Sequence, residues 1–204
     1  MGSIGREVSR VERMQDNMSQ VKIEIGGGTL PKGDGFINLD GQSCADVVID
    51  FEHGKLPFES DSVDMVYSSH CLEHVKNAIG LMIDVLRVCK LGASVEIRLP
   101  HWLHPNAMVH GVPEFGGHVH VISDRAIRTW CQESRSIWKS TGKRFRLDNI
   151  HYQIDEAYHE LRPLFPALTD HQVAKYIPNC CHEIHCFMTV VEYEEYNPND
   201  PENN

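Results

Sequence analysis

Four short apolar runs in the first third of the chain each end in residues suited to hold a ligand. The runs and their endings are Ile23–Ile25 before Gly26, Gly27 and Gly28; Ile37–Leu39 before Asp40; Val47–Ile49 before Asp50 and Phe51; and Met65–Tyr67 before Ser68, Ser69 and His70. Connecting segments separate the runs, and this alternation predicts a mainly parallel sheet of the α/β class. In an open sheet of that class, ligands bind outside the carboxyl ends of the strands, where the strand order reverses. The sequence therefore predicts one ligand site assembled from several strand ends.

Two later segments extend this pattern. The stretch SSHCLEH covers residues 68–74, and LRVCKLGASVEIRLP covers residues 86–100. Together with the strand ends, they resemble the class I S-adenosylmethionine-dependent methyltransferases, in the branch called methyltransferase type 11, over roughly residues 21–125. The match departs at Leu91, where proline is usual, and at Ala93, where a second glycine is usual. The resemblance implies a Rossmann-like, seven-stranded, mainly parallel sheet with helices on both faces and an antiparallel last strand.

The same resemblance implies S-adenosyl-L-methionine as the cofactor. Asp40 would accept hydrogen bonds from the ribose hydroxyls, and Asp50 with Phe51 would border the adenine. Glu24 would hold the methionine ammonium, and the glycines would let the backbone approach the cofactor closely. Three alternatives stay open, namely Asp40 opening a turn with Gly41, Asp50 capping a helix, and Glu24 standing exposed on its strand. The predicted cofactor-binding residues are Glu24, Gly26, Gly27, Gly28, Asp40, Asp50, Phe51, Ser69 and His70.

The connection between the first two runs is unusually short. Only residues 29–36, with Pro31, Gly33 and Gly35 among them, follow Gly28 before the second run. A parallel crossover usually contains a dozen or more residues and a helix, so we expect this helix to be absent or reduced to a turn. Its loss removes the helix N-terminus that would hold a pyrophosphate, which disfavours an NAD(P)-dependent oxidoreductase. S-adenosylmethionine carries no phosphate and tolerates the loss better.

Histidine is abundant, with 13 in the chain and five between His101 and His120. This segment follows the predicted fifth strand and is expected to lie over the active site. Imidazole has a pKa of about 6.5 and suits a general base near neutral pH. His118 and His120 alternate with valines, which predicts both histidines on one strand face and the valines packed inward. The predicted catalytic residues are His70, His101, His118 and His120.

Metal binding is an alternative use of these histidines. His118 and His120 form a possible metal pair. Further candidate ligands gather near the C-terminus at Cys180, Cys181, His182, His185 and Cys186. These spacings match no standard zinc pattern, so we predict no metal site. His74 is expected to close a helix turn.

The 204 residues fit one domain. We expect an N-terminal arm at residues 1–20, a single methyltransferase domain at 21–196 and a disordered tail at 197–204. The formal charge of −10 argues against a nucleic-acid partner held by its phosphates. The chain shows no apolar run of membrane-spanning length and no basic amphipathic stretch, so we expect a cytoplasmic protein with reduced cysteines and no membrane partner. The sequence gives no indication of an oligomeric state.

These observations favour transfer of a methyl group from S-adenosylmethionine to a small or medium acceptor molecule, with the His-rich segment on the acceptor side. Two other functions stay open. One is a non-catalytic or regulatory protein that keeps the fold, since a fold alone does not establish activity. The other is a metal-dependent enzyme that uses the histidine cluster.

Overall fold

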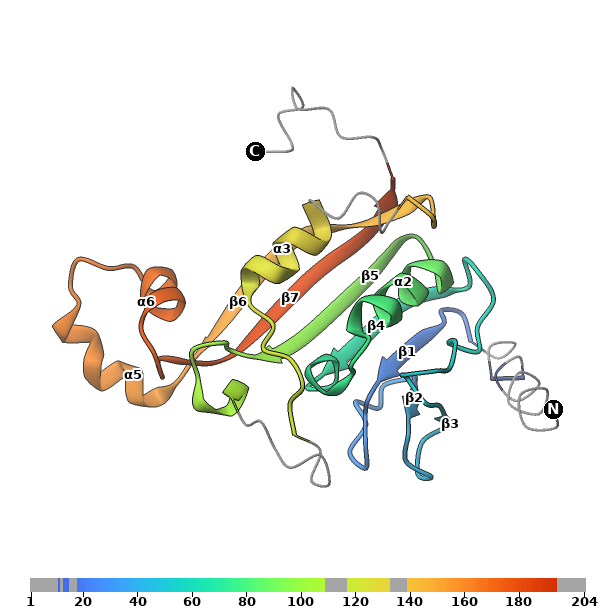
Figure 1. Cartoon of the computed structure of the whole chain (residues 1–204), viewed down its shortest axis with the longest axis horizontal. Coiled ribbons are helices and arrows are strands. Elements are labelled where there is room, and N and C mark those ends of the chain that lie inside the picture. The colour runs from blue at the N-terminus through green and yellow to red at the C-terminus, as the bar shows by residue number, and fades with distance from the viewer. Residues whose placement is uncertain (1–10, 12, 15–17, 109–116, 133–138, 194–204) are drawn as a thin grey trace.

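Seven strands form one sheet at the centre of the molecule (Figure 1). The computed structural model describes residues 11, 13, 14, 18–108, 117–132 and 139–193. The strands are β1 (Lys22–Ile25), β2 (Phe36–Asp40), β3 (Val47–Val48), β4 (Val63–Ser69), β5 (Cys89–Pro100), β6 (Lys143–Ile154) and β7 (Cys181–Glu192). Their order is β3-β2-β1-β4-β5-β7-β6, and β7 runs antiparallel to both of its neighbours while the other pairings are parallel. The predicted Rossmann-like α/β class, with its antiparallel last strand, is confirmed, but in the described part of the chain the central helices lie on one face of the sheet and not on both as expected (Figure 1).

The helices are short, and the two central ones lie on the same side of the sheet (Figure 1). The α-helices are α2 (Ala78–Val88), α3 (Asp124–Gln132), α5 (Glu156–Leu161) and α6 (Asp170–Tyr176), and the 3-10 helices are η1 (Leu72–His74), η2 (Pro105–Met108) and η4 (Arg162–Leu164). Helix α2 is N-capped by Asn77, whose side chain accepts a hydrogen bond from the Gly80 amide and so satisfies one free donor of the first turn. Helices α5 and α6 lie beyond one end of β6 and β7 (Figure 1).

Alternating side chains give the sheet an apolar face and a more polar face. Ile23, Ile25 and Val95 are at most 2% exposed and belong to the main core. The Cys131 side chain of α3 contacts that of Met188, which is paired with Val95 in the strand register, so the helices cover the apolar face. The intervening positions carry mostly polar side chains, among them Lys22, Glu24, Tyr67, Glu96 and Arg98.

The strand order reverses between β1 and β4, which places a crevice at the carboxyl ends of these two strands. Residues 26–35, which connect β1 to β2, contain turns and bends but no helix, so the expected loss of the crossover helix is confirmed. At the end of β4, His70 adopts a φ of 50°, which is unusual for a residue with a side chain. Strained backbone of this kind often marks a functional site.

Helix α2 passes directly into β5, because Cys89 leaves the helix in an extended conformation. Strand β7 begins at Cys181 and takes in a segment that was considered as a source of metal ligands. Most of residues 1–20 and all of 197–204 lie outside the described residues, so the domain boundaries stay predictions. Within the described chain, none of the helices combines the length and apolar character needed to cross a membrane.

Candidate active site

A cavity of about 730 Å³ lies at the carboxyl ends of β1, β2 and β4, where the strand order reverses. It brings together strand ends that are far apart in the sequence, as the apolar runs predicted. The predicted cofactor residues that line it are Gly26, Gly28, Asp40, Asp50, Phe51 and His70. A second group of lining residues comes from η1 and its flanks, namely Cys71, His74 and Val75. The shape and position fit an elongated ligand laid across the strand ends.

Asp40 ties two strand ends together. One carboxylate oxygen accepts a hydrogen bond from the Gly28 amide at 2.9 Å, and the other accepts from the Gln42 amide at 2.9 Å. A carboxylate has about four lone-pair sites, so Asp40 keeps acceptor capacity for ligand hydroxyls. The turn with Gly41 that was considered as an alternative is therefore present and is compatible with a ribose-binding role.

The glycine run is required by the protein itself. A Cβ built on Gly26, which has a φ of +78°, would lie 2.5 Å from both Cβ and Sγ of Cys71. A Cβ on Gly27 would lie 2.5 Å from Oδ1 of Asn38. Only Gly28 leaves open space, since its nearest neighbour is the Gln42 side chain at 3.8 Å. Gly28 is thus the glycine whose missing side chain faces the cavity, whereas Gly26 and Gly27 allow close internal packing.

Glu24 is buried beneath the glycine turn, with 4% of its surface exposed, so the exposed-strand alternative is wrong. Its Oε2 accepts a hydrogen bond from the Lys32 amide at 2.6 Å, and burial raises the pKa of its carboxyl group. In the described chain, Glu24 is not among the residues that line the cavity. The hydrogen bond from the Lys32 amide ties Glu24 to the 26–35 connection.

Asp50 and Phe51 form one wall of the cavity. The Asp50 carboxylate accepts from the Glu52 amide at 2.9 Å and lies 2.9 Å from Nδ1 of His53, and this His53 hydrogen bond lowers the pKa of Asp50. Phe51 packs against the main core and presents an aromatic surface to the cavity. Ser69 ends β4 but is not among the described residues that line the cavity.

His70 is held between two acidic side chains. Its Nε2 lies 2.6 Å from Oε2 of Glu183, and its Nδ1 lies 3.3 Å from Oε1 of Glu73. The hydrogen bond to Glu183, supported by Glu73, raises the pKa of His70 to about 9. His70 is therefore a cation at neutral pH, and a general base, which must be free to accept a proton, is not what this geometry provides.

His101 lies in the core rather than in the cavity. It is fully buried, its ring lies 3.9 Å from that of Trp102 between centroids, and its Nδ1 accepts from the Leu103 amide at 3.3 Å. Burial lowers the pKa of His101 to about 4. The hydrogen-bond direction at Nδ1 leaves the proton on Nε2, which has no partner among the described residues. The structure assigns His101 to packing and not to proton transfer.

His118 and His120 point in different directions, so the expectation of one shared strand face is wrong. Residues 117–123 form no strand, because the Val119 and His120 amides both donate to the Glu73 carbonyl oxygen at 2.8 and 3.1 Å. His118 then faces Glu73 and His74, while Nε2 of His120 lies 2.9 Å from the Lys76 carbonyl oxygen. The valines that were expected to pack inward are exposed, at 43% for Val119 and 42% for Val121.

The C-terminal cysteines have buried side chains. Cys180, Cys181 and Cys186 are fully buried, and they are free thiols. Burial raises the pKa of Cys181 and of Cys186 to about 12, and both side chains pack in the main core. His185 forms an ion pair with Glu183 instead.

The sequence did not predict that Glu73 and Glu183 contact His70, or that His74 lines the cavity. Glu73 is 1% exposed and contacts His70 and His118, while His74 lines the cavity. The signal for Glu73 and His74 was present in the SSHCLEH stretch, where a carboxylate and an imidazole follow the end of β4 within one turn. Nothing local linked Glu183 to His70, since the contact depends on the antiparallel position of β7 beside β5.

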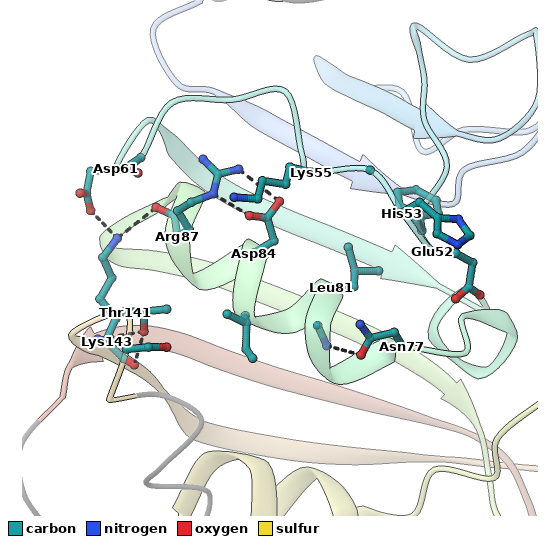
Figure 2. Close-up of a pocket in the computed structure, with 16 residues that line it drawn as sticks. Glu52, His53, Lys55, Asp61, Asn77, Leu81, Asp84, Arg87, Thr141 and Lys143 are labelled. Carbon is teal, nitrogen blue, oxygen red and sulfur yellow. Dashed lines mark hydrogen bonds and ion pairs between the residues drawn. The ribbon is translucent and has the colours of Figure 1, made fainter. Parts of the chain in front are cut away.

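A second cavity, of about 600 Å³, runs along the outer side of α2 (Figure 2). Figure 2 shows Glu52 and His53 at one end, and Asp61 with Lys143 at the other. Its strongest charges already pair with each other, because Arg87 contacts Asp84 and Lys143 contacts Asp61. These contacts fasten α2 to its surroundings, so we place the chemistry in the strand-end cavity.

Comparisons with known proteins bear on the domain and the fold. Residues 23–97 match the family profile described as a methyltransferase domain. A protein of Mycobacterium tuberculosis (strain ATCC 25177 / H37Ra), described as an uncharacterized methyltransferase, is 41% identical over 63 residues, which is 31% of this chain and 21% of that protein. The chain thus spans about a fifth of the length of the curated relatives that it matches.

Solved structures share the architecture over nearly the whole chain. An S-adenosylmethionine-dependent methyltransferase from Archaeoglobus fulgidus superposes with a TM-score of 0.58 at 15% identity, covering 92% of this chain and 95% of that chain. One from Mesorhizobium loti gives a TM-score of 0.53 at 11% identity, covering 87% and 96%. At such identities the likeness shows the fold. The domain match over residues 23–97 and the shared fold thus make the chain similar to the S-adenosylmethionine-dependent methyltransferases.

Proposed function

We propose that the protein is an enzyme that transfers the methyl group of S-adenosylmethionine to a small or medium acceptor molecule. The observation that carries the proposal is the 730 Å³ cavity at the strand-order reversal, lined by an acidic strand end, an aromatic side chain and a histidine cation. Bound there, the cofactor supplies an electrophilic methyl group on a sulfonium sulfur. The role left to the protein is mainly to align the acceptor atom with that methyl group.

Each wall of the cavity suits one part of the cofactor. Asp40 has spare acceptor sites for the ribose hydroxyls, and Phe51 offers a flat apolar surface to the adenine. The Asp50 carboxylate is turned towards His53 and the Glu52 amide, so its contact to the adenine amino group would use the remaining lone pairs. His70 also lines the cavity and would border the methionine half with its ring, since both ring nitrogens face the carboxylates of Glu183 and Glu73.

The acceptor side is formed by His74 and His118 rather than by the whole histidine segment. His74 lines the cavity, and its ring centroid is 4.7 Å from that of His118. His101 is buried in the core and His120 faces the Lys76 carbonyl oxygen, so neither supports a catalytic role. The net charge of −10 favours neutral or cationic small acceptors over nucleic acids.

Binding and turnover test the proposal in sequence. Calorimetry with S-adenosylhomocysteine should show one site, and methyl-labelled S-adenosylmethionine should label a component of fractionated metabolite pools only when the protein is present. Absence of S-adenosylhomocysteine binding at millimolar concentration would overturn the cofactor assignment. Tight binding without any labelled product across the pools would favour the regulatory, non-catalytic alternative over the enzyme.

A further inference from the structure

Glu73 is a buried carboxyl group whose side-chain oxygens lack hydrogen bonds. It is 1% exposed, and neither carboxylate oxygen has a hydrogen-bond partner among the described residues. Its Oε1 lies 3.3 Å from Nδ1 of the His70 cation, whose Nε2 is paired with Glu183. A buried carboxylate is stable only when it is paired, hydrogen-bonded or bound to a metal. Glu73 thus shares the positive charge of His70 with a second carboxylate, which leaves Glu73 with capacity for a further cation.

Two imidazoles converge on this carboxylate. Ligand atoms of Glu73, His74 and His118 lie within 4.8 Å of one another, and Nε2 of His118 lies 4.0 Å from Oε1 of Glu73. The rings of His74 and His118 meet edge to face, with centroids 4.7 Å apart. Two histidines and one carboxylate form a recurring ligand set for divalent transition metals. Metal–ligand distances are about 2.0–2.2 Å, so each of the three ligand atoms must move roughly 1 Å closer to the centre of the group to bind one cation.

The surroundings of His118 prepare it for this role. Its Nδ1 lies 3.4 Å from the Ala107 carbonyl oxygen, so a proton on Nδ1 leaves the Nε2 lone pair facing Glu73. A carbonyl that fixes the tautomer of a ligating histidine is the usual outer-shell arrangement at metal sites. The backbone adds a second tie, since the Val119 and His120 amides both donate to the Glu73 carbonyl oxygen.

We propose that Glu73, His74 and His118 bind a divalent transition-metal cation at the acceptor end of the cofactor cavity. Three protein ligands leave coordination positions open, as in catalytic rather than structural metal sites. Because His74 also lines the cavity, the open positions face the space where the acceptor would lie. Metal binding itself does not depend on the proposed function, but its catalytic role does.

The site narrows the acceptor to molecules with an oxygen nucleophile, such as a hydroxyl group. An oxygen bound to the cation loses its proton to solvent more readily, because the positive charge stabilises the oxyanion. That oxygen forms a bond to the methyl carbon while the bond from sulfur to that carbon breaks. The electron pair of the broken bond stays on sulfur, which leaves neutral S-adenosylhomocysteine and the methyl ether or ester.

Titration of metal-stripped protein with Co²⁺ and Zn²⁺ tests the site directly, by the visible absorption of Co²⁺ and by calorimetry. Wild type should bind one equivalent. His118→Ala should weaken binding by about 100-fold or more, since even outer-shell partners of metal ligands change affinity by about 10–100-fold. The matched control is His120→Ala, which removes the histidine that faces the Lys76 carbonyl oxygen and should leave the metal affinity within about threefold of wild type.

Glu73→Gln is a second variant, and circular dichroism establishes that each variant is folded. Wild type without stoichiometric metal binding, or equal losses in His118→Ala and His120→Ala, would overturn the site. S-adenosylhomocysteine binding is measured in the same samples. Cofactor binding without metal binding refutes the metal site alone, whereas metal binding without cofactor binding refutes the proposed function and leaves the metal site standing.

Discussion

Gly26 and Cys71 are packed so closely that a Cβ on the glycine would lie 2.5 Å from both Cβ and Sγ of the cysteine. This contact joins the end of β1 to the start of η1, directly at the strand-order reversal. Gly26 therefore keeps two walls of the cavity together through a contact within the chain, and it also lines the cavity itself.

Gly26→Ala and Gly28→Ala form a matched pair that separates packing from ligand approach. Both glycines have positive φ, of +78° and +55°, so each alanine is strained. Gly26→Ala also drives a methyl group into Cys71, which should add about 1–3 kcal/mol of destabilisation. Urea unfolding should therefore rank Gly26→Ala well below Gly28→Ala in stability. Equal unfolding midpoints would contradict the packing account.

Asp40→Asn should weaken S-adenosylhomocysteine binding by about tenfold or more, because hydrogen bonds to charged groups contribute about 1.5–3 kcal/mol. The amide oxygen of asparagine can still accept from one of the two backbone amides, so the fold should survive. Calorimetry measures the affinity. Asp46→Asn is the control, since that carboxylate accepts from the Asn38 amide at 3.0 Å but does not line the cavity. Equal affinity in Asp40→Asn and wild type would sink the ribose-binding role.

The strand ends could be predicted because their information is local. An apolar run, the glycine or acid after it and the short 29–36 connection all lie within a few residues of each other, and parallel strands bring such ends to one edge of the sheet. The absence of the crossover helix could be predicted because the 29–36 connection is shorter than the dozen or more residues that such a crossover usually contains. The same logic placed Asp40, Phe51 and His70 around one cavity.

The roles of the histidines could not be predicted, because the described residues 101–108 and 117–123 form no strand. Alternation implies a shared face only within a strand. Here the Glu73 carbonyl oxygen accepts hydrogen bonds from two successive amides, which turns His118 inward and His120 aside. His101 is buried by its position at the end of β5, where its amide donates to the His182 carbonyl oxygen of β7. These outcomes depend on contacts between segments far apart in the chain.

Lys143→Met should destabilise the fold by about 2–3 kcal/mol, since it removes a buried ammonium group that donates hydrogen bonds to carbonyl oxygens at the C-terminus of α2. Lys143 is 8% exposed, and its ammonium group pairs with Asp61 (Figure 2). The same group donates to the Leu86 carbonyl oxygen at 3.1 Å. Lys90→Met is the comparison, because the Lys90 side chain is 45% exposed in its pair with Asp64. Exposed pairs contribute at most about 1 kcal/mol. Similar losses in both variants by urea unfolding would refute the capping role.

His101 should make the folded protein sensitive to mild acid. Burial lowers its pKa to about 4 in the folded state, against about 6.5 when unfolded, with Asp124 and His104 as the nearby charged groups. The unfolded chain therefore binds more protons between these values, and stability falls as the pH drops from about 6.5 to 4. The full contribution is about 3 kcal/mol.

His101→Phe keeps a ring against Trp102 and removes the titration, so its stability should vary less over this pH range. The free energy of unfolding in urea, measured from pH 7 to pH 4 for wild type and variant, gives the difference directly. Other titrating groups contribute equally to the pH dependence of both proteins, so their contributions cancel when the two curves are subtracted. Parallel curves would show that His101 is not held neutral by burial. Loss of methyl transfer in a folded His101→Phe protein would show that His101 takes part in catalysis, as the sequence predicted.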